Sequence, residues 1–149
     1  MIEFQLKIDS RILNAIIPKI EESFSLAGKR DWKKTFACPN LDDPDLANAW
    51  NDGLQEDFFS DRKALAKLLE SQKFKYGYVE VKEEEVESIV RSLSEVRLTI
   101  RESFLFSIED DKLESGDFDL AKQDNSVRLG YFSYLVLAEI QENLIANSN

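Results

Sequence analysis

Two arginines on one predicted helix are the residues best suited to chemistry in this chain. Residues 85–106 read EVESIVRSLSEVRLTIRESFLF, and their apolar members recur at helical spacing around Leu93. On that helix Arg97 falls within the apolar stripe, and Arg101 lies on its shoulder. A guanidinium can hold a carboxylate or a phosphate through two parallel hydrogen bonds. The two arginines could therefore bind an anionic ligand, or they could act as a structural pin inside the core.

The last predicted helix carries an acid that could meet these arginines. With Val136 at the centre of its apolar stripe, Glu139 lies within that stripe. We predict that Arg97 is largely buried and paired with Glu139, because each alone would be an uncompensated buried charge. In the alternative interpretation, Arg97 and Arg101 line a pocket for an anion and Glu139 serves as a base. The sequence favours the structural pin, since the chain itself supplies the acid.

A second candidate contact is the basic cluster KRDWKK at residues 29–34. Its four bases are Lys29, Arg30, Lys33 and Lys34. The cluster could bind an anion or an acidic peptide. It could also be a solvated loop pinned by Trp32 and Phe36, and the sequence favours this second interpretation.

The composition argues against histidine and metal chemistry. The chain has no histidine and one cysteine, which removes histidine-based triads, the commonest general base and zinc sites. Three consecutive acids at residues 83–85 would fan out around a helix start, so they suit the helix dipole better than a cation. The acidic segment 109–124 lacks the ligand spacing of a calcium-binding loop, because Lys122 falls where the final glutamate is required. We predict neither a metal ion nor a cofactor.

The net charge of −10 bears on the choice of partner. Nucleic-acid phosphates and anionic membranes repel an acidic chain, so we expect no nucleic acid and no membrane as a partner. No apolar run is long enough to span a membrane, and the first residues lack the pattern of a signal peptide, so a cytoplasmic location is expected. We expect a protein partner instead. The chain should be a monomer, or a homodimer if two copies share its very apolar last helix.

Periodicity and turn residues predict a mainly α fold of the α+β class, with five helices and a short two-stranded β-ribbon in one domain. The predicted elements are strands 2–8 and 75–81 and helices 10–27, 44–53, 60–72, 83–107 and 127–146, within a single domain 1–149. Pro18 predicts a bend or break in the first helix between residues 14 and 21. Pro44 predicts the first turn of the second helix, and Gly53 predicts its end.

The C-terminal half carries a resemblance. Residues 78–111 read YVEVKEEEVESIVRSLSEVRLTIRESFLFSIEDD, and residues 138–145 read AEIQENLI. These stretches resemble an uncharacterised bacterial domain-of-unknown-function family of short, acidic, mostly helical proteins, often encoded beside the adaptor of the Clp protease. The family pattern is a strand, an acid-rich helix start, a leucine-x-x-leucine-arginine-leucine stretch, an acidic loop and a final leucine-glutamine-glutamate helix. The arginine stretch is matched here by Leu93, Val96, Arg97 and Leu98.

The chain departs from the family pattern at two places. Ser94 stands where the family usually has asparagine, and Lys82 stands where a capping threonine is common. The N-terminal half agrees only in outline. The resemblance implies a mainly helical fold and a link to regulated proteolysis through gene neighbourhood, and it implies no activity.

Three hypotheses about function follow. The first is a non-enzymatic cytoplasmic interaction or regulatory protein, which is based on the missing histidines, the poor metal spacing and the one-sided charge. The second is a binder of a small anionic ligand, or an enzyme acting on it, that uses Arg97 and Arg101. The third is a mimic whose acidic face occupies a basic site on another protein. A deep pocket that exposes both arginines would favour the second hypothesis, whereas arginines buried in ion pairs would favour the first.

Overall fold

The chain is mainly helical, as predicted, with one small antiparallel ribbon. The computed structural model describes residues 1–30 and 42–148. In these ranges its elements are β1 (Ile2–Gln5), α1 (Ser10–Gly28), α3 (Pro44–Leu69), η1 (Lys73–Tyr76), β2 (Tyr78–Val81), η2 (Glu83–Glu85), α4 (Val86–Phe104), α5 (Asp110–Ser115), η3 (Leu120–Lys122) and α6 (Asn125–Asn147). The predicted fold class is confirmed.

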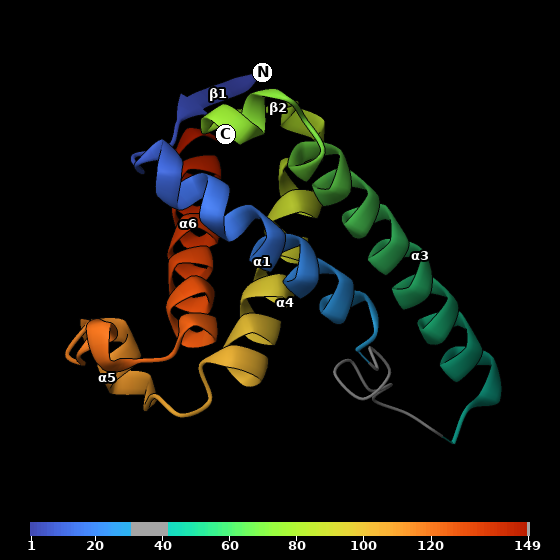
Figure 1. Ribbon diagram of the computed structural model, residues 1–149. Helices are drawn as coiled ribbons and strands as arrows, with labels where there is room; N and C mark the ends of the chain where they lie inside the picture. Colours follow the sequence, from blue (N-terminus) through green and yellow to red (C-terminus); the bar gives the residue numbers. More distant parts are fainter. Residues whose placement is uncertain (31–41, 149) are drawn as a thin grey trace.

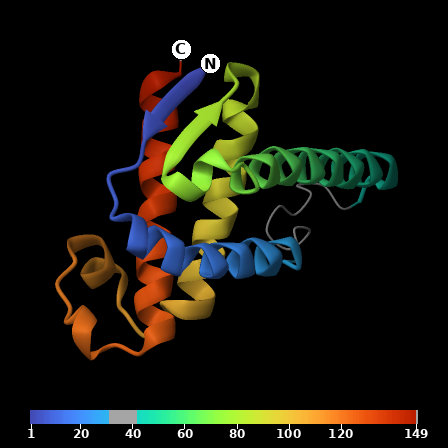
Figure 2. The same cartoon turned by 45° about the horizontal axis from the view of Figure 1, so that its top comes forward.

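The helices α4 and α6 lie antiparallel and form the centre of the molecule (Figure 1). The helix α1 crosses both of them on one face, and the ribbon lies at the end where α6 finishes and α4 begins (Figure 2). The helix α3 packs on α4 near the ribbon, and its N-terminal part points away from α6. Within the described residues, no helix combines the length and the apolar composition needed to cross a bilayer.

The ribbon is shorter than the sequence predicts. Ile2 is paired with Val81, and Phe4 with Val79. The second strand begins only at Tyr78, because the preceding residues form the turn η1, which ends at Gly77 with a φ of 80°. A left-handed φ suits glycine because it has no Cβ to clash with the backbone. The alternation of the first strand is confirmed, and its apolar side faces the core.

Of the bend or break predicted at Pro18, the break does not occur, and the bend stays a prediction. The helix α1 runs without interruption from Ser10 to Gly28. Pro18 and Asn14, whose carbonyl loses its helical hydrogen bond, both lie on the exposed face of α1. Water can solvate that carbonyl, so the helix continues despite the missing donor. Buried side chains on the other face, such as Ile16 and Ile20, hold the helix against α4 and α6.

The predicted helix end at Gly53 is also wrong. The predicted helices 44–53 and 60–72 form one continuous helix, α3. The helix α3 begins as expected at Pro44, where the Asp43 carboxylate accepts hydrogen bonds from the backbone amides of Asp45 and Leu46 at 3.1 Å. It then continues through Gly53 to Leu69. A glycine inside a helix costs only about 1 kcal/mol, so it does not by itself end one. No side chain between residues 44 and 60 is fully buried.

The close approach of α4 and α6 depends on Gly130. A Cβ at this position would lie 2.9 Å from the Cβ of Phe104, which is too close for two carbons. The two helices share the centre of the hydrophobic core, where their fully buried side chains include Ile89, Leu93, Ile100, Leu137, Ile140 and Leu144. Their contact therefore needs a residue without a side chain at this point.

Two alanine substitutions should separate these roles of glycine. We expect Gly53→Ala to raise the free energy of unfolding by about 0.5–1 kcal/mol, because alanine is the better helix former and its Cβ meets open space. We expect Gly130→Ala to lower it by about 1–3 kcal/mol, because α4 and α6 must move apart. Urea denaturation followed by circular dichroism measures both. A destabilising Gly53→Ala would contradict the continuous helix.

Candidate functional site

The predicted pair of Arg97 and Glu139 does not form. Arg97 donates a hydrogen bond from Nη1 to Oε1 of Gln141 at 2.7 Å. Glu139 instead accepts a hydrogen bond from the backbone amide of Lys7 at 2.9 Å. Residues two apart on a helix point in widely different directions, so the side chains of Glu139 and Gln141 face different neighbours. It is Gln141 that faces α4.

Gln141 is a buried side chain with three hydrogen bonds. It accepts from Arg97, and its Nε2 donates to the carbonyl of Val90 at 3.0 Å and to Oγ of Ser94 at 2.7 Å. An amide can accept and donate at once, which a carboxylate cannot do. The network therefore ties α6 to three successive turns of α4.

The charge of Arg97 has no acidic partner in the part of the chain that the structure describes. Its guanidinium lies over the ring of Tyr134, 4.5 Å from the ring centroid, so a cation–π contact supplements the bond to Gln141. Its Nε is buried and has no hydrogen-bond partner among the described residues. The side chain of Arg97 is partly buried, so its predicted burial agrees with the structure while its predicted acidic partner does not.

Arg101, in contrast, has an acidic partner. It pairs with Asp110 at the start of α5, and hydrogen bonding to Asp110 raises the pKa of the Arg101 guanidinium. Together Ser94, Arg97, Leu98, Arg101 and Tyr134 line a small pocket of about 170 Å³, which we call the arginine pocket. The structure thus brings Arg97 and Arg101 to one site, as the second hypothesis expected, and leaves Glu139 out of it.

The basic cluster is only partly described. Arg30 donates to Glu102 at 2.9 Å and lies 3.7 Å from Glu95, so two acids on α4 neutralise it. Lys29 is exposed at the end of α1. Lys33 and Lys34 lie outside the described residues. The contacts of Arg30 agree with a structural role, since they fasten the end of α1 to α4.

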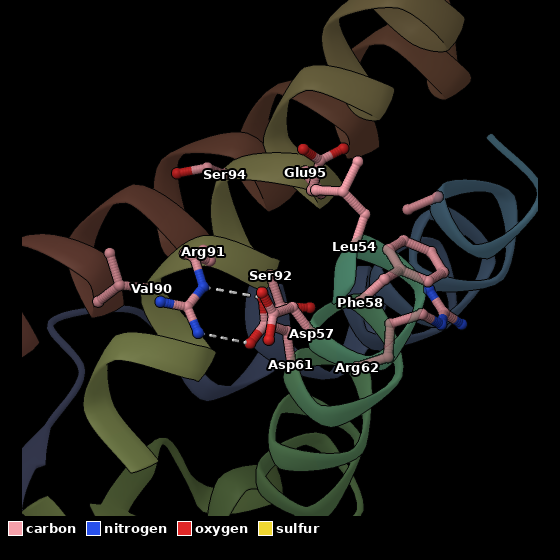
Figure 3. A pocket seen from close by; sticks show the side chains of 11 residues that line it. Leu54, Asp57, Phe58, Asp61, Arg62, Val90, Arg91, Ser92, Ser94 and Glu95 are labelled. Atoms are coloured by element: carbon pink, nitrogen blue, oxygen red, sulfur yellow. Dashed lines mark hydrogen bonds and ion pairs between the residues drawn. The ribbon is translucent and has the colours of Figure 1, made fainter. Parts of the chain in front are cut away.

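A larger concave site lies between α1, α3 and α4, and sequence reasoning missed it. Its volume is about 410 Å³, and Figure 3 shows the side chains around it. Its lining consists of Ala27, Leu54, Asp57, Phe58, Asp61, Arg62, Val90, Arg91, Ser92, Ser94 and Glu95. We call it the α3 groove. A signal for it was present in the helical spacing of Leu54, Phe58 and Leu65, but the assumed helix end at Gly53 and the assumed restart at Ser60 concealed it.

An ion pair between α3 and α4 holds one side of the α3 groove. Arg91 donates from Nε and Nη2 to the two carboxylate oxygens of Asp61, at 2.9 and 3.0 Å (Figure 3). Asp61 is buried, and its hydrogen bonds raise the pKa of Arg91. Two parallel bonds of this kind fix orientation as well as distance. The angle between α3 and α4 is thereby set where α3 leaves the core.

Arg62 holds the other side of the α3 groove against α1. Its guanidinium lies 4.0 Å from the centroid of the Phe24 ring and donates to the Phe24 carbonyl at 2.9 Å. Burial lowers the pKa of Arg62 below its usual value. A Cβ on Gly28 would lie 2.6 Å from this guanidinium, so glycine leaves room for the contact. The groove is therefore built by side chains on three helices.

Comparison of the chain with family models, with curated proteins and with solved structures finds no match. The resemblance to a bacterial family of short acidic helical proteins therefore stays a prediction. Within the described ranges, no group of three or more histidine, cysteine, aspartate or glutamate side chains is arranged to hold a metal ion. The arginine pocket and the α3 groove are the two concave sites from which function is argued below.

A double-mutant cycle should locate the true partner of Arg97. We expect Arg97→Met and Gln141→Leu to show a coupling energy of about 1–2 kcal/mol, because a hydrogen bond to a charged group is lost only once in the double variant. The matched cycle of Arg97→Met with Glu139→Leu should be additive within about 0.5 kcal/mol. Denaturant unfolding measures both cycles. Strong coupling to Glu139 would restore the ion pair that the sequence suggests.

Proposed function

We propose that the protein is a non-enzymatic interaction module that binds a short segment of a partner protein in the α3 groove. The segment places large apolar side chains between α3 and α4 and carries lysine or arginine beside α3. The single observation that carries the proposal is an apolar groove bordered by a helix whose projecting half bears only acidic charges.

The shape and lining of the groove support a peptide or side-chain ligand. Ala27, Leu54, Phe58 and Val90 provide apolar wall. The charged groups of Asp61, Arg62 and Arg91 at its border are already oriented by the contacts described above. Protein sites that take up ligand groups are usually of this kind, concave and mostly apolar with a few placed polar groups. An amphipathic segment that lays its apolar side into such a groove is a recurring mode of recognition.

Contacts between helices hold the groove in shape, so it does not have to become ordered when it binds the partner segment. The bidentate contact of Arg91 with Asp61 and the stacking of Arg62 on Phe24 tie α3 to both neighbouring helices. A site held open in advance loses less conformational entropy when it binds. The binding free energy of a short segment can then be used for affinity rather than for ordering the groove.

The charge on α3 supports a basic partner. Between residues 44 and 60 the charged residues are Asp45, Asp52, Glu56 and Asp57, with no lysine or arginine among them. The whole chain has a net charge of −10, so its field also attracts cations. Charge complementarity speeds encounter and disfavours partners of the same sign. We therefore assign basic flanks to the partner segment.

The proposal extends to a cytoplasmic location and a role in regulated proteolysis. The location is argued from the sequence alone, and the link to proteolysis comes from the family resemblance alone. The absence of histidine supports a role without catalysis, because the commonest general base is missing.

Selection of peptides should test the groove and its preference together. A displayed library of short peptides is selected on the wild-type protein, and the enriched peptides are synthesised. We expect apolar anchors flanked by lysine or arginine. Leu54→Lys should weaken their binding by at least about ten-fold, because it places a charge in the apolar wall and repels the basic flanks.

The control variant is Gln55→Lys, which adds the same charge one residue further along α3 on an exposed position that does not line the groove. We expect its affinity to stay within about two-fold of wild type. Isothermal titration calorimetry measures both variants. Acidic enriched peptides, or peptides that bind Leu54→Lys as tightly as wild type, would refute the proposal.

A further inference from the structure

We propose that the arginine pocket binds a single small oxyanion, a phosphate or a carboxylate group, between Arg97 and Arg101. This site is separate from the peptide groove and goes beyond the proposed function. This oxyanion is the charged end of a small molecule. Arg97 is central to its binding, because Arg97 has no acidic partner among the described residues.

The uncompensated charge of Arg97 is the first reason. Its contacts within the described residues are a neutral amide and an aromatic ring, which orient the guanidinium without cancelling its charge. Arg101 lies one helical turn further on the same side of α4 and adds a second positive charge. Like charges at this spacing repel each other. An anion bound between them would remove that repulsion.

The second reason is that Arg101 is paired with an exposed acid, Asp110, which a ligand can replace. The acids that act on Arg101 are Asp110, which pairs with it, and more weakly Glu114, and both belong to α5 rather than to the walls of the pocket. The Asp110 side chain is 76% exposed. Exposed ion pairs contribute little free energy, so Arg101 can leave Asp110 for a ligand at small cost.

The size and lining of the pocket define the ligand. A volume of about 170 Å³ is well below the range of pockets that enclose a whole drug-sized molecule, so the pocket takes one functional group. Arg97 and Arg101 provide charged donors, and the hydroxyls of Ser94 and Tyr134 add neutral ones. Leu98 is 37% exposed at the same place and offers an apolar contact to the body of the ligand. The ligand that matches this pocket is an oxyanion attached to an apolar or aromatic body.

The oxyanion does not come from a nucleic acid or an anionic membrane in this proposal. The net charge of −10 repels an extended polyanion, whereas a single small group meets only the local field of the two arginines. Two sources of the same chemistry remain, a phosphate monoester and a carboxylate. Phenyl phosphate and benzoate represent them with the same aromatic body.

The test is a titration of the intact protein with phenyl phosphate and, separately, with benzoate at constant ionic strength, followed by amide chemical shifts in nuclear magnetic resonance. We expect saturable shifts centred on Ser94, Leu98, Arg101 and Tyr134. Saturation by one probe identifies its head group as the ligand class, and saturation by both identifies a general oxyanion site. If neither probe saturates, the proposal is overturned.

Three variants complete the test. Arg97→Gln and Arg101→Gln should each weaken binding by at least about ten-fold, because each removes one charged donor. Arg11→Gln removes the same charge from an arginine on α1 whose side chain is 91% exposed, and it should change the affinity by less than about two-fold. If Arg97→Gln does not fold, Arg101→Gln decides alone. The proposal would be overturned if Arg101→Gln bound the probe with wild-type affinity, or if all three variants lost affinity equally.

Discussion

The packing of α4 against α6 is the constraint on which the other elements depend. The two helices approach closely because Gly130 leaves room for Phe104, and the buried Gln141 bonds to three points along α4. A buried amide must keep its partners or lose several hydrogen bonds, so it adds a directional constraint to the apolar packing. Gln141 therefore fixes the register of the pair, and α1, α3 and the ribbon pack on the surface that results.

The helix α3 differs from the other long helices because only its C-terminal part belongs to the core. Leu65, Leu68 and Leu69 are buried there, while the preceding turns carry acids and partly exposed apolar side chains. Asp61 and Arg62 stand where the core ends, and each binds a different neighbouring helix. These two contacts decide the direction in which α3 leaves the body. The groove exists because that direction holds α3 apart from α1 and α4.

Elements with a strong local signal could be predicted from the sequence. The alternation of β1, the start of α3 at Pro44 and the long helices α4 and α6 all follow from periodicity and capping, and each is confirmed. The break predicted at Pro18 and the end predicted at Gly53 are wrong for different reasons. Gly53 costs a helix only about 1 kcal/mol, so α3 continues through it although no side chain between residues 44 and 60 is fully buried. Pro18 costs more, and the buried face of α1 on either side of it offsets that cost. A breaker on an exposed face does not end a helix whose other face is buried.

The sites could be predicted less well, because they depend on how helices are rotated against one another. Periodicity correctly placed Arg97 close to the apolar stripe of α4, but on α6 it placed only Glu139 within the stripe and left out Gln141. It could not show which of the two faces α4. The α3 groove was beyond reach for a similar reason, since its walls come from three helices and no single stretch contains its pattern.

Gln141, and not Glu139, faces α4, and this links the fold to the arginine pocket. Burying a carboxylate at position 141 would leave the Val90 carbonyl and the Ser94 hydroxyl without their amide donor, so the helix contact favours a neutral side chain. That choice leaves Arg97 oriented by Gln141 and Tyr134 but not neutralised. A glutamate would have satisfied the charge and closed the site. The amide that fixes the register of α4 on α6 is therefore also what leaves a positive charge available to a ligand in a strongly acidic protein.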